Sequence, residues 1–214
     1  MSRKKDIFLA LLLTIFFISF AVCFTVFFKP LYYFDIDYLN IDKYVLIDIE
    51  TIKKNYDILI EYQSLFYNGT LNLPDFVMST QGRIHFEEVK RIFEFIQISC
   101  ILTGVISIPL VYRNVKDKEY DFLKLTSIFS IGIPLVLGMI ASADFNQAFV
   151  WFHQIVFRND YWIFDYRTDP IIKILPESFF MHCFMLIVAI VIVLSILCYI
   201  IYRRKRKNIL KDYI

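Results

Sequence analysis

Four long apolar stretches constrain the fold of this chain more than any other feature. They cover residues 7–28, 92–112, 122–141 and 178–202 of the 214-residue sequence, of which 58% is hydrophobic. About 20 mostly apolar residues are needed to cross the hydrocarbon core of a bilayer. In lipid such a segment must satisfy its own backbone hydrogen bonds, so it forms a helix. The sequence therefore predicts an all-α integral membrane protein, a single membrane domain over residues 1–214 with four transmembrane helices.

The first stretch has 22 residues and no charge. The apolar core of a secretory signal peptide is shorter, about 7–15 residues, and is followed by a cleavage site with small residues. We therefore expect residues 7–28 to be an uncleaved anchor.

Basic residues predict the orientation of the spans. They cluster before the first span, between the second and third, and after the fourth: Arg3, Lys4, Lys5; Arg113, Lys116, Lys118; Arg203, Arg204, Lys205, Arg206, Lys207. Short loops rich in Lys and Arg stay in the cytoplasm. Residues 1–6, 113–121 and 203–214 are thus predicted to be cytoplasmic, and residues 29–91 and 142–177 to form an extracytoplasmic cap of amphipathic helices and irregular loops.

Apolar periodicity predicts helices within the two outer segments. Three- and four-residue steps favour an amphipathic helix over residues 49–66, and aromatic side chains at 145, 149 and 152 with Val156 predict another over residues 145–157, lying in the membrane interface. A third helix is expected to begin near Arg83 and run unbroken into the second span. The string "FDIDY" alternates apolar and acidic residues, which predicts a short strand.

Three histidines are the first candidates for chemistry: His85, His153 and His182. Histidine exchanges a proton near neutral pH because its unperturbed pKa is about 6.5. His85 and His153 fall in the outer segments near the predicted membrane surface, whereas His182 falls inside the fourth span. His85 and His153 are either a catalytic pair or two interfacial polar residues whose ring nitrogens bond to backbone carbonyls.

Other kinds of site have weaker support. Zinc needs three or four ligands; Asp144 or Glu87 could join the two histidines, but the HExxH spacing is absent. No G-x-S-x-G motif indicates a serine nucleophile, and the spans have neither paired aspartates nor HExxH for an intramembrane protease. We expect no cofactor, no metal and no nucleic-acid partner.

Residues 149–180, "FVWFHQIVFRNDYWIFDYRTDPIIKILPESFF", mix charge with aromatic side chains. The arginines could bind a phosphate or a carbonyl oxygen, and the aspartates could orient a histidine or receive an ammonium group. Alternatively, these charges pair with one another to shape a compact loop, and the aromatic residues form an interfacial belt.

This string, together with "NYDILIEYQ" and "GRIHFEEVKRIF", resembles the lipoprotein intramolecular transacylase family of Gram-positive bacteria. The resemblance covers most of residues 50–180. Tyr166 departs from the family pattern, which has proline after the Phe-Asp pair, and this bears on the shape of the loop.

The resemblance implies a four-span acyltransferase of the bacterial cell membrane with its active site at the outer face. It implies that the sn-2 acyl chain of a diacylglyceryl-cysteine lipoprotein moves to the α-amino group of the same cysteine, giving the N-acyl S-monoacylglyceryl form. The partners would be lipoproteins and membrane lipid, and the chain would act as a monomer. The implied catalytic residues are His85 and His153. The candidate substrate-binding or orienting residues are Arg158, Asn159, Asp160, Trp162, Asp165, Asp169, Tyr56 and Tyr62.

The chemistry of this reaction suits two histidines. Attack by the amine on the sn-2 ester passes through an eight-membered ring, whose ordering an enzyme can supply. The amine has a pKa of about 7.7–8.0 and must lose a proton to attack, so a base helps. Our hypothesis makes His85 the base and lets His153 stabilise the oxyanion or protonate the departing alkoxide; the reverse assignment stays open. The alternative function is a non-catalytic membrane protein that binds lipids or lipoproteins as an accessory factor.

Overall fold

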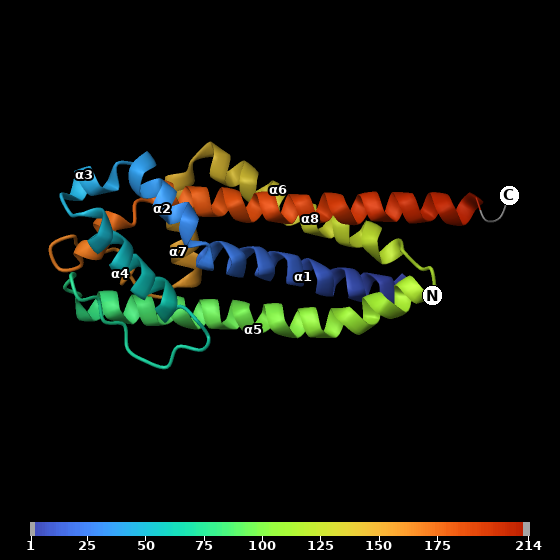
Figure 1. Cartoon of the computed structure of the whole chain (residues 1–214), viewed down its shortest axis with the longest axis horizontal. Helices are drawn as coiled ribbons and strands as arrows, with labels where there is room; N and C mark the ends of the chain where they lie inside the picture. Colours follow the sequence, from blue (N-terminus) through green and yellow to red (C-terminus); the bar gives the residue numbers. More distant parts are fainter. Residues whose placement is uncertain (1–2, 212–214) are drawn as a thin grey trace. The chain divides into compact units, whose positions relative to one another are not determined.

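The computed structural model describes residues 3–211, and within this range the protein is helical with no strand (Figure 1). The elements in chain order are α1 (Arg3–Phe27), α2 (Lys29–Tyr38), α3 (Ile41–Val45), α4 (Ile49–Tyr62), α5 (Thr80–Lys116), α6 (Asp121–Ala143), α7 (Phe145–Val156), the 3-10 helix η1 (Pro170–Ile174) and α8 (Glu177–Lys211). The predicted all-α fold is confirmed.

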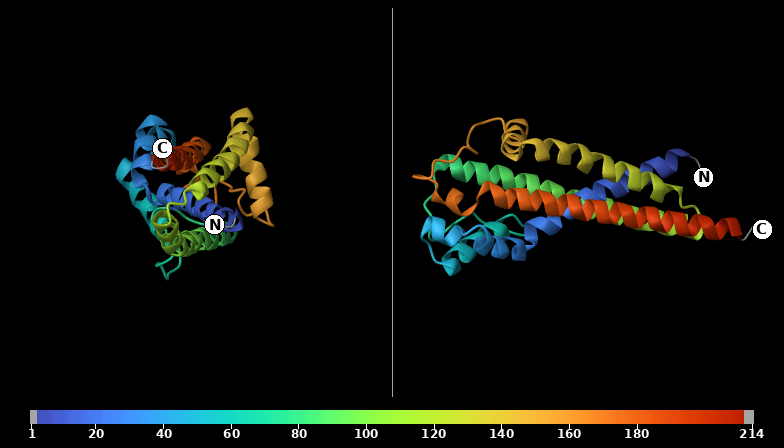
Figure 2. Two further views of the ribbon diagram at one scale, coloured as in Figure 1. Left: turned by 90° about the vertical axis from the view of Figure 1, so that its right-hand side faces the viewer. Right: turned by 90° about the horizontal axis from the view of Figure 1, so that it is seen from above.

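Four of these helices are long and apolar enough to cross a membrane, and they appear as long ribbons in Figure 2. The four segments are Lys4–Phe27, Thr80–Lys116, Asp121–Ala143 and Glu177–Asn208. Each overlaps one predicted span. The 37 residues of α5 measure about 55 Å at 1.5 Å per residue, well beyond the ~30 Å of a hydrocarbon core. Five charged residues lie between positions 83 and 91, so this helix extends past its apolar part, as the sequence predicted.

The chain folds into two compact units. The first contains the chain up to Cys23, Gln97–Met139 and the chain from Leu186 onward; the second contains Phe24–Ile96 and Ile140–Met185. The first unit therefore holds most of the apolar stretches, and the second holds the whole of the two segments predicted to lie outside the cell.

In the first unit, α1, α6 and α8 share an apolar core. Its buried members are Leu9, Leu13, Phe17, Phe122, Leu123, Cys198 and Tyr202. Close approach of α1 and α5 depends on Gly104, because a Cβ there would lie 3.0 Å from the Phe16 ring. The hydroxyl groups of Thr14 and Ser130 lie 3.2 Å apart and hydrogen-bond between α1 and α6.

The strand expected at "FDIDY" is wrong, because these residues belong to α2. Pro30 occupies the first turn of α2, where its fixed φ favours a helix and its missing N–H costs nothing. The buried residues Tyr32, Asp35 and Ile36 follow the i, i+3, i+4 spacing of a helix face. The two-residue alternation was too short to outweigh this pattern.

Three aromatic rings form the centre of the second unit. Tyr32 of α2 stacks on Tyr56 of α4 with ring centroids 3.7 Å apart, and Phe179 of α8 meets both rings edge-on at 5.0 and 5.8 Å. The Tyr32 hydroxyl donates to the carbonyl of Ile174 in η1 at 2.6 Å. Burial raises the pKa of Tyr32, so the hydroxyl keeps its proton and remains a donor. One cluster thus ties together α2, α4, η1 and α8.

An acid–histidine pair joins α2 to α8 beside this cluster. Asp35 is fully buried, and Nδ1 of His182 lies 2.8 and 2.9 Å from its two carboxylate oxygens. A buried carboxylate is costly without a partner. The third histidine of the sequence therefore has a structural partner within the second unit.

Replacing Asp35 with alanine should destabilise the protein, because the partly buried ring of His182 would lose its hydrogen-bond partner. Leaving a buried polar group unpaired costs about 1–3 kcal/mol. The measurement is thermal unfolding of the purified protein in detergent, with Asp37→Ala as control because Asp37 lies on the exposed side of the same helix. Equal unfolding temperatures for the two variants would show that the Asp35–His182 pair contributes nothing.

Candidate functional site

Asp169 fixes the start of α5, and His85 follows in the second turn of this helix. Ser79 precedes the helix, and its hydroxyl accepts from the backbone N–H of Gly82 at 2.9 Å, a helix N-cap. The backbone N–H of Ser79 donates to Oδ1 of Asp169 at 2.8 Å, and the Thr168 hydroxyl donates to Oδ2 at 2.7 Å. Asp169 is 2% exposed. It holds the start of the helix that carries His85.

The second histidine lies on the inward face of α7. Asp144 caps this helix by accepting from the backbone N–H of Gln147 at 3.0 Å. Phe145 and Phe149 pack against Phe184 and Phe180 of α8, with centroids 6.3 and 5.4 Å apart.

The apolar face predicted for α7 is divided in the structure. Phe145, Phe149 and His153 face inward, whereas Phe152 and Val156 are exposed. All four predicted apolar residues lie on one face of the helix, but only Phe145 and Phe149 pack against α8, whereas Phe152 and Val156 remain exposed.

His85 and His153 lie next to each other inside an aromatic enclosure. Their ring centroids are 6.1 Å apart with the ring planes inclined by 36°. Phe157 touches both rings, at 4.7 Å from His85 and 5.6 Å from His153. The remaining rings around the pair are Phe86 and Phe164 on the His85 side, and Phe149, Phe152 and Trp162 on the His153 side. The two histidines are 5% and 9% exposed, so the pair is largely shielded from water.

One hydrogen bond assigns the tautomer of His153. Its Nδ1 lies 2.7 Å from the carbonyl oxygen of Phe149, which can only accept, so Nδ1 carries the hydrogen. In the neutral ring, Nε2 then carries the lone pair. Burial lowers the pKa of His153, and the bond to Phe149 opposes this only in part. The neutral, proton-accepting form of His153 is favoured.

His85 has a different environment. Its Nδ1 is enclosed and has no hydrogen-bond partner among the described residues. The rings that contact the His85 ring are those of three phenylalanines and His153.

Three of the predicted substrate-binding or orienting residues lie around the pair. The Trp162 ring is 4.9 Å from that of His153. Asn159 donates to Oε1 of Glu88 on α5 at 2.8 Å, and Asp169 caps the same helix.

The other predicted residues lie elsewhere. Asp165 pairs with Arg167 at 2.7 Å, and this guanidinium lowers the pKa of Asp165 to about 2. Arg158 and Asp160 are exposed to solvent. Tyr56 and Tyr62 are core residues, 2% and 3% exposed.

Sequence reasoning missed Glu88, Phe157 and Phe164. Glu88 follows His85 by three residues on a helix that was predicted, so the i, i+3 spacing could have placed both on one face. The two phenylalanines belong to the irregular segment after α7, where periodicity gives no signal.

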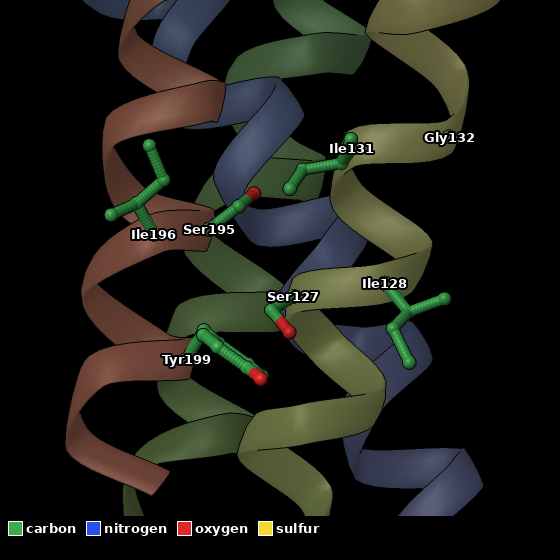
Figure 3. Close-up of a pocket in the computed structure, with 7 residues that line it drawn as sticks. All are labelled: Ser127, Ile128, Ile131, Gly132, Ser195, Ile196 and Tyr199. Carbon is green, nitrogen blue, oxygen red and sulfur yellow. The ribbon is translucent and has the colours of Figure 1, made fainter. Parts of the chain in front are cut away.

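Other arrangements offer less chemistry. Among residues 3–211, no group of three or more His, Cys, Asp or Glu side chains is placed to hold a metal ion. A cavity of about 400 Å³ in the first unit is lined by residues of α6 and α8: Ser127, Ile128, Ile131, Gly132, Ser195, Ile196 and Tyr199 (Figure 3). The Ser127 and Ser195 hydroxyls already donate to carbonyls of their own helices. This lining suits an apolar chain and has no group for proton transfer near neutral pH.

A protein-family model and solved structures of one family are similar to this chain. Residues 7–180 match the family model of the lipoprotein intramolecular transacylase Lit. A solved structure of the membrane integral lipoprotein intramolecular transacylase Lit from Bacillus cereus is 41% identical, has a TM-score of 0.94 and is matched over 96% of each chain. A second structure of that protein, with an H85R mutation, is 40% identical with a TM-score of 0.88, over 98% of this chain and 94% of that one.

A curated relative from Aquifex aeolicus, described as an uncharacterized protein, is 33% identical over 95 residues. The match covers 44% of this chain and 42% of that relative's length.

Replacing Gly82 with alanine should weaken the start of α5. A Cβ at this position would overlap Oδ1 of Asp169, which is already held by Ser79. Displacing that carboxylate leaves buried groups unpaired, at about 1–3 kcal/mol. Thermal unfolding in detergent measures the loss. Gly132→Ala is the control, since a Cβ there meets no atom within 4 Å; equal behaviour of the two variants would contradict the clash.

Acid should destabilise the protein partly through His153. Its folded pKa is lowered, whereas the unfolded value is about 6.5. Between these values the unfolded chain binds more protons, so this contribution to stability is present above about pH 6.5 and is lost as pH falls towards the folded pKa. The unfolding temperature should therefore drop less between about pH 7.5 and pH 5 in His153→Gln than in the wild type. An identical drop would exclude His153 as a contributor.

Proposed function

Because this chain belongs to the lipoprotein intramolecular transacylase family, a family of acyltransferases, we propose that it moves an acyl chain within a lipid-modified bacterial lipoprotein. The proposed substrate carries a diacylglyceryl group on the sulfur of its N-terminal cysteine. The sn-2 acyl chain passes to the α-amino group of that cysteine and leaves an N-acyl S-monoacylglyceryl lipoprotein. The enclosed pair His85 and His153, with ring centroids 6.1 Å apart, is the observation that supports this reaction.

The reaction needs two proton transfers and no external acyl donor. The C–N bond of an amide forms, and the C–O bond of the sn-2 ester breaks. The ammonium group loses two protons: one frees the attacking lone pair and is released, and the other balances the hydrogen that the glyceryl oxygen gains. Groups within ~3 Å of the reacting atoms can carry these protons, and the adjacent rings suit this requirement.

We assign the role of general base to His153. The initial hypothesis gave it to His85, but the bond from His153 Nδ1 to the Phe149 carbonyl favours the reverse. With Nδ1 protonated, the Nε2 lone pair is free to accept a proton from the cysteine amine. The lowered pKa of His153 keeps this lone pair available near neutral pH.

His85 is then the donor. Its enclosed Nδ1 has no partner among the described residues, and an unpaired acceptor is tolerated there better than an unpaired N–H. The hydrogen of the neutral ring is accordingly placed on Nε2. From there it stabilises the oxyanion of the tetrahedral intermediate and afterwards passes this hydrogen to the departing alkoxide, while the second proton of the amine replaces it on Nε2.

The aromatic enclosure explains how transfer outcompetes hydrolysis. Water near the activated ester would cleave it, and a closed apolar site keeps water away from reactive intermediates. The same walls can hold the glyceryl group folded so that amine and ester meet, which supplies the order of the eight-membered transition state.

The remaining site residues have supporting roles in this proposal. Trp162 and Asn159 line the reaction site; Arg158, Asp160 and Asp165 contact the lipoprotein chain from their exposed positions; Tyr56, Tyr62 and Asp169 hold the helices that present the pair. From the basic segments we propose that both termini are cytoplasmic and that the site faces outward. The protein acts as a monomer and needs no cofactor.

Substituting alanine for His85 or His153 should reduce conversion of the diacylglyceryl form by at least about a hundredfold, because each residue supplies a proton-transfer step. The measurement is mass spectrometry of a lipoprotein's N-terminal peptide, in a host that lacks its own N-acylating enzyme. Gln154→Ala is the control, since Gln154 is the exposed neighbour of His153 on α7.

Two outcomes would count against the proposal. If the wild-type protein leaves the lipoprotein diacylated, the chain binds lipoproteins without modifying them. If both histidine variants reach the membrane and still convert the substrate, the chemistry lies elsewhere in the protein.

A further inference from the structure

We propose that Glu88 binds the α-ammonium group of the lipidated cysteine and thereby selects substrate over product. This inference rests on the proposed function and adds a residue to it. It starts from an enclosed carboxylate oxygen next to the histidine pair that nothing in the described residues satisfies.

Glu88 lies beside the pair for two independent reasons. It follows His85 by three residues on α5, and residues so spaced are neighbours on one helix face. The segment after α7 runs along this face: Phe157 contacts the His85 ring, and Asn159, two residues on, bonds to Glu88. The Glu88 carboxylate therefore lies on the same side of the site as the two histidine rings.

The Glu88 carboxylate is held in place through only one of its two oxygen atoms. Oε1 accepts from the side-chain amide of Asn159 at 2.8 Å, whereas Oε2 is enclosed and has no hydrogen-bond partner in the part of the chain that the structure describes. Asn159 is itself oriented, because its oxygen accepts from the backbone N–H of Tyr161 at 3.0 Å. The carboxylate is thus a fixed acceptor whose second oxygen is shielded from water and unpaired. Such an oxygen is suited to a hydrogen-bond donor that arrives with the substrate.

The three basic residues nearest Glu88 along α5 do not bond to its Oε2: Arg91 is exposed, and the other two bond elsewhere. Lys90 pairs with Glu94 at 2.9 Å and donates to the carbonyls of Tyr62 and Ser64. Arg83 donates to the Leu71 carbonyl. An enclosed carboxylate is expensive without a compensating charge, and a primary ammonium supplies both a positive charge and three N–H donors.

The substrate offers one such group at the required place. The reacting cysteine carries the only α-ammonium of the lipoprotein chain, and a charge-assisted bond to Glu88 would keep its nitrogen beside the two rings. When His153 Nε2 takes one proton, the neutral amine remains hydrogen-bonded to Glu88 through a second N–H, and its lone pair is free for the ester carbonyl. That second proton then passes to Nε2 of His85 as the hydrogen of this nitrogen moves to the glyceryl oxygen and the C–O bond breaks.

The same contact distinguishes substrate from product. After transfer, the nitrogen is an amide with a single N–H and no charge. It can no longer compensate the Glu88 carboxylate, so the product is held less tightly than the substrate and is released.

The experiment compares two non-reacting probes on the full-length protein in detergent. Both are synthetic cysteinyl peptides with an S-dialkylglyceryl ether group, which has no ester to transfer; one has a free α-amine and the other is N-acetylated. At about pH 7 the wild type should bind the free amine roughly tenfold or more tightly than the acetylated probe, as a charged hydrogen bond predicts. Glu88→Gln keeps the shape and the Asn159 contact but should bring this ratio close to one.

Two controls keep the test decisive. Glu87→Gln removes an exposed charge from the neighbouring position and should leave the ratio unchanged. In the wild type alone, raising the pH to about 9.5 deprotonates the probe amine, whose pKa is about 7.7–8.0, and should lower the ratio; this holds even if Glu88→Gln fails to fold.

The outcomes separate this inference from the proposed function. Discrimination that survives in Glu88→Gln, or that ignores pH in the wild type, overturns the ammonium site. The proposed function fails instead if the wild type does not convert the corresponding ester-linked peptide, whatever the binding ratio. A lost ratio in Glu88→Gln together with conversion by the wild type supports both.

Discussion

The bond from His153 to the Phe149 carbonyl is the interaction on which the proposed chemistry of this site depends. An imidazole can act as a base in an apolar enclosure only if its hydrogen is on the nitrogen turned away from the substrate. The carbonyl lies one turn back on α7, so the helix itself supplies the acceptor at 2.7 Å. The capping of α7 by Asp144 and its packing on α8 through Phe149 and Phe180 keep that turn in place. The tautomer is thus a consequence of helix geometry.

The aromatic enclosure has a cost that the surrounding polar contacts offset. Rings exclude water from an activated ester, but they also leave charged and polar groups without solvent. Both carboxylate oxygens of Asp169 accept hydrogen bonds, from Ser79 and Thr168, whereas only one oxygen of Glu88 does so, from Asn159. Around the histidine pair, three enclosed atoms have no hydrogen-bond partner among the described residues: Nδ1 of His85, Oε2 of Glu88 and Nε1 of Trp162. Such atoms also occur elsewhere in the described part of the chain, for example Oδ1 of Asn55 and Oγ of Ser107.

The sequence predicted those parts of the fold that repeat regularly. The apolar runs and the spacing of buried residues anticipated the four long helices, α4, α7 and the unbroken α5. The strand predicted within α2 was wrong because the five-residue string "FDIDY" is compatible both with two-residue alternation of apolar and acidic residues and with the spacing of a helix face. Pairing of His85 with His153 could be proposed because both were expected near the membrane surface, but their separation depends on Phe157 in an irregular segment. Tyr56 and Tyr62 look similar to site residues in sequence because an aromatic ring in a core and one in a binding site have the same pattern.

Polar groups divide between the two units in a way that follows from their surroundings. In the first unit, Thr14 and Ser130 hydrogen-bond between two helices, but the hydroxyls of Ser19, Thr126, Ser127 and Ser195 donate to carbonyls of their own helices one turn back. Such bonds satisfy a hydroxyl without a partner helix, as a segment in lipid requires. In the second unit, by contrast, Asp35, Glu88 and Asp169 each bond to a residue far away in the sequence. Long-range polar contacts fix relative positions as well as satisfying atoms, and the proposed sharing of one substrate group by two histidines needs that fixed geometry. The polar chemistry of the chain is therefore concentrated where its helices are joined by such contacts.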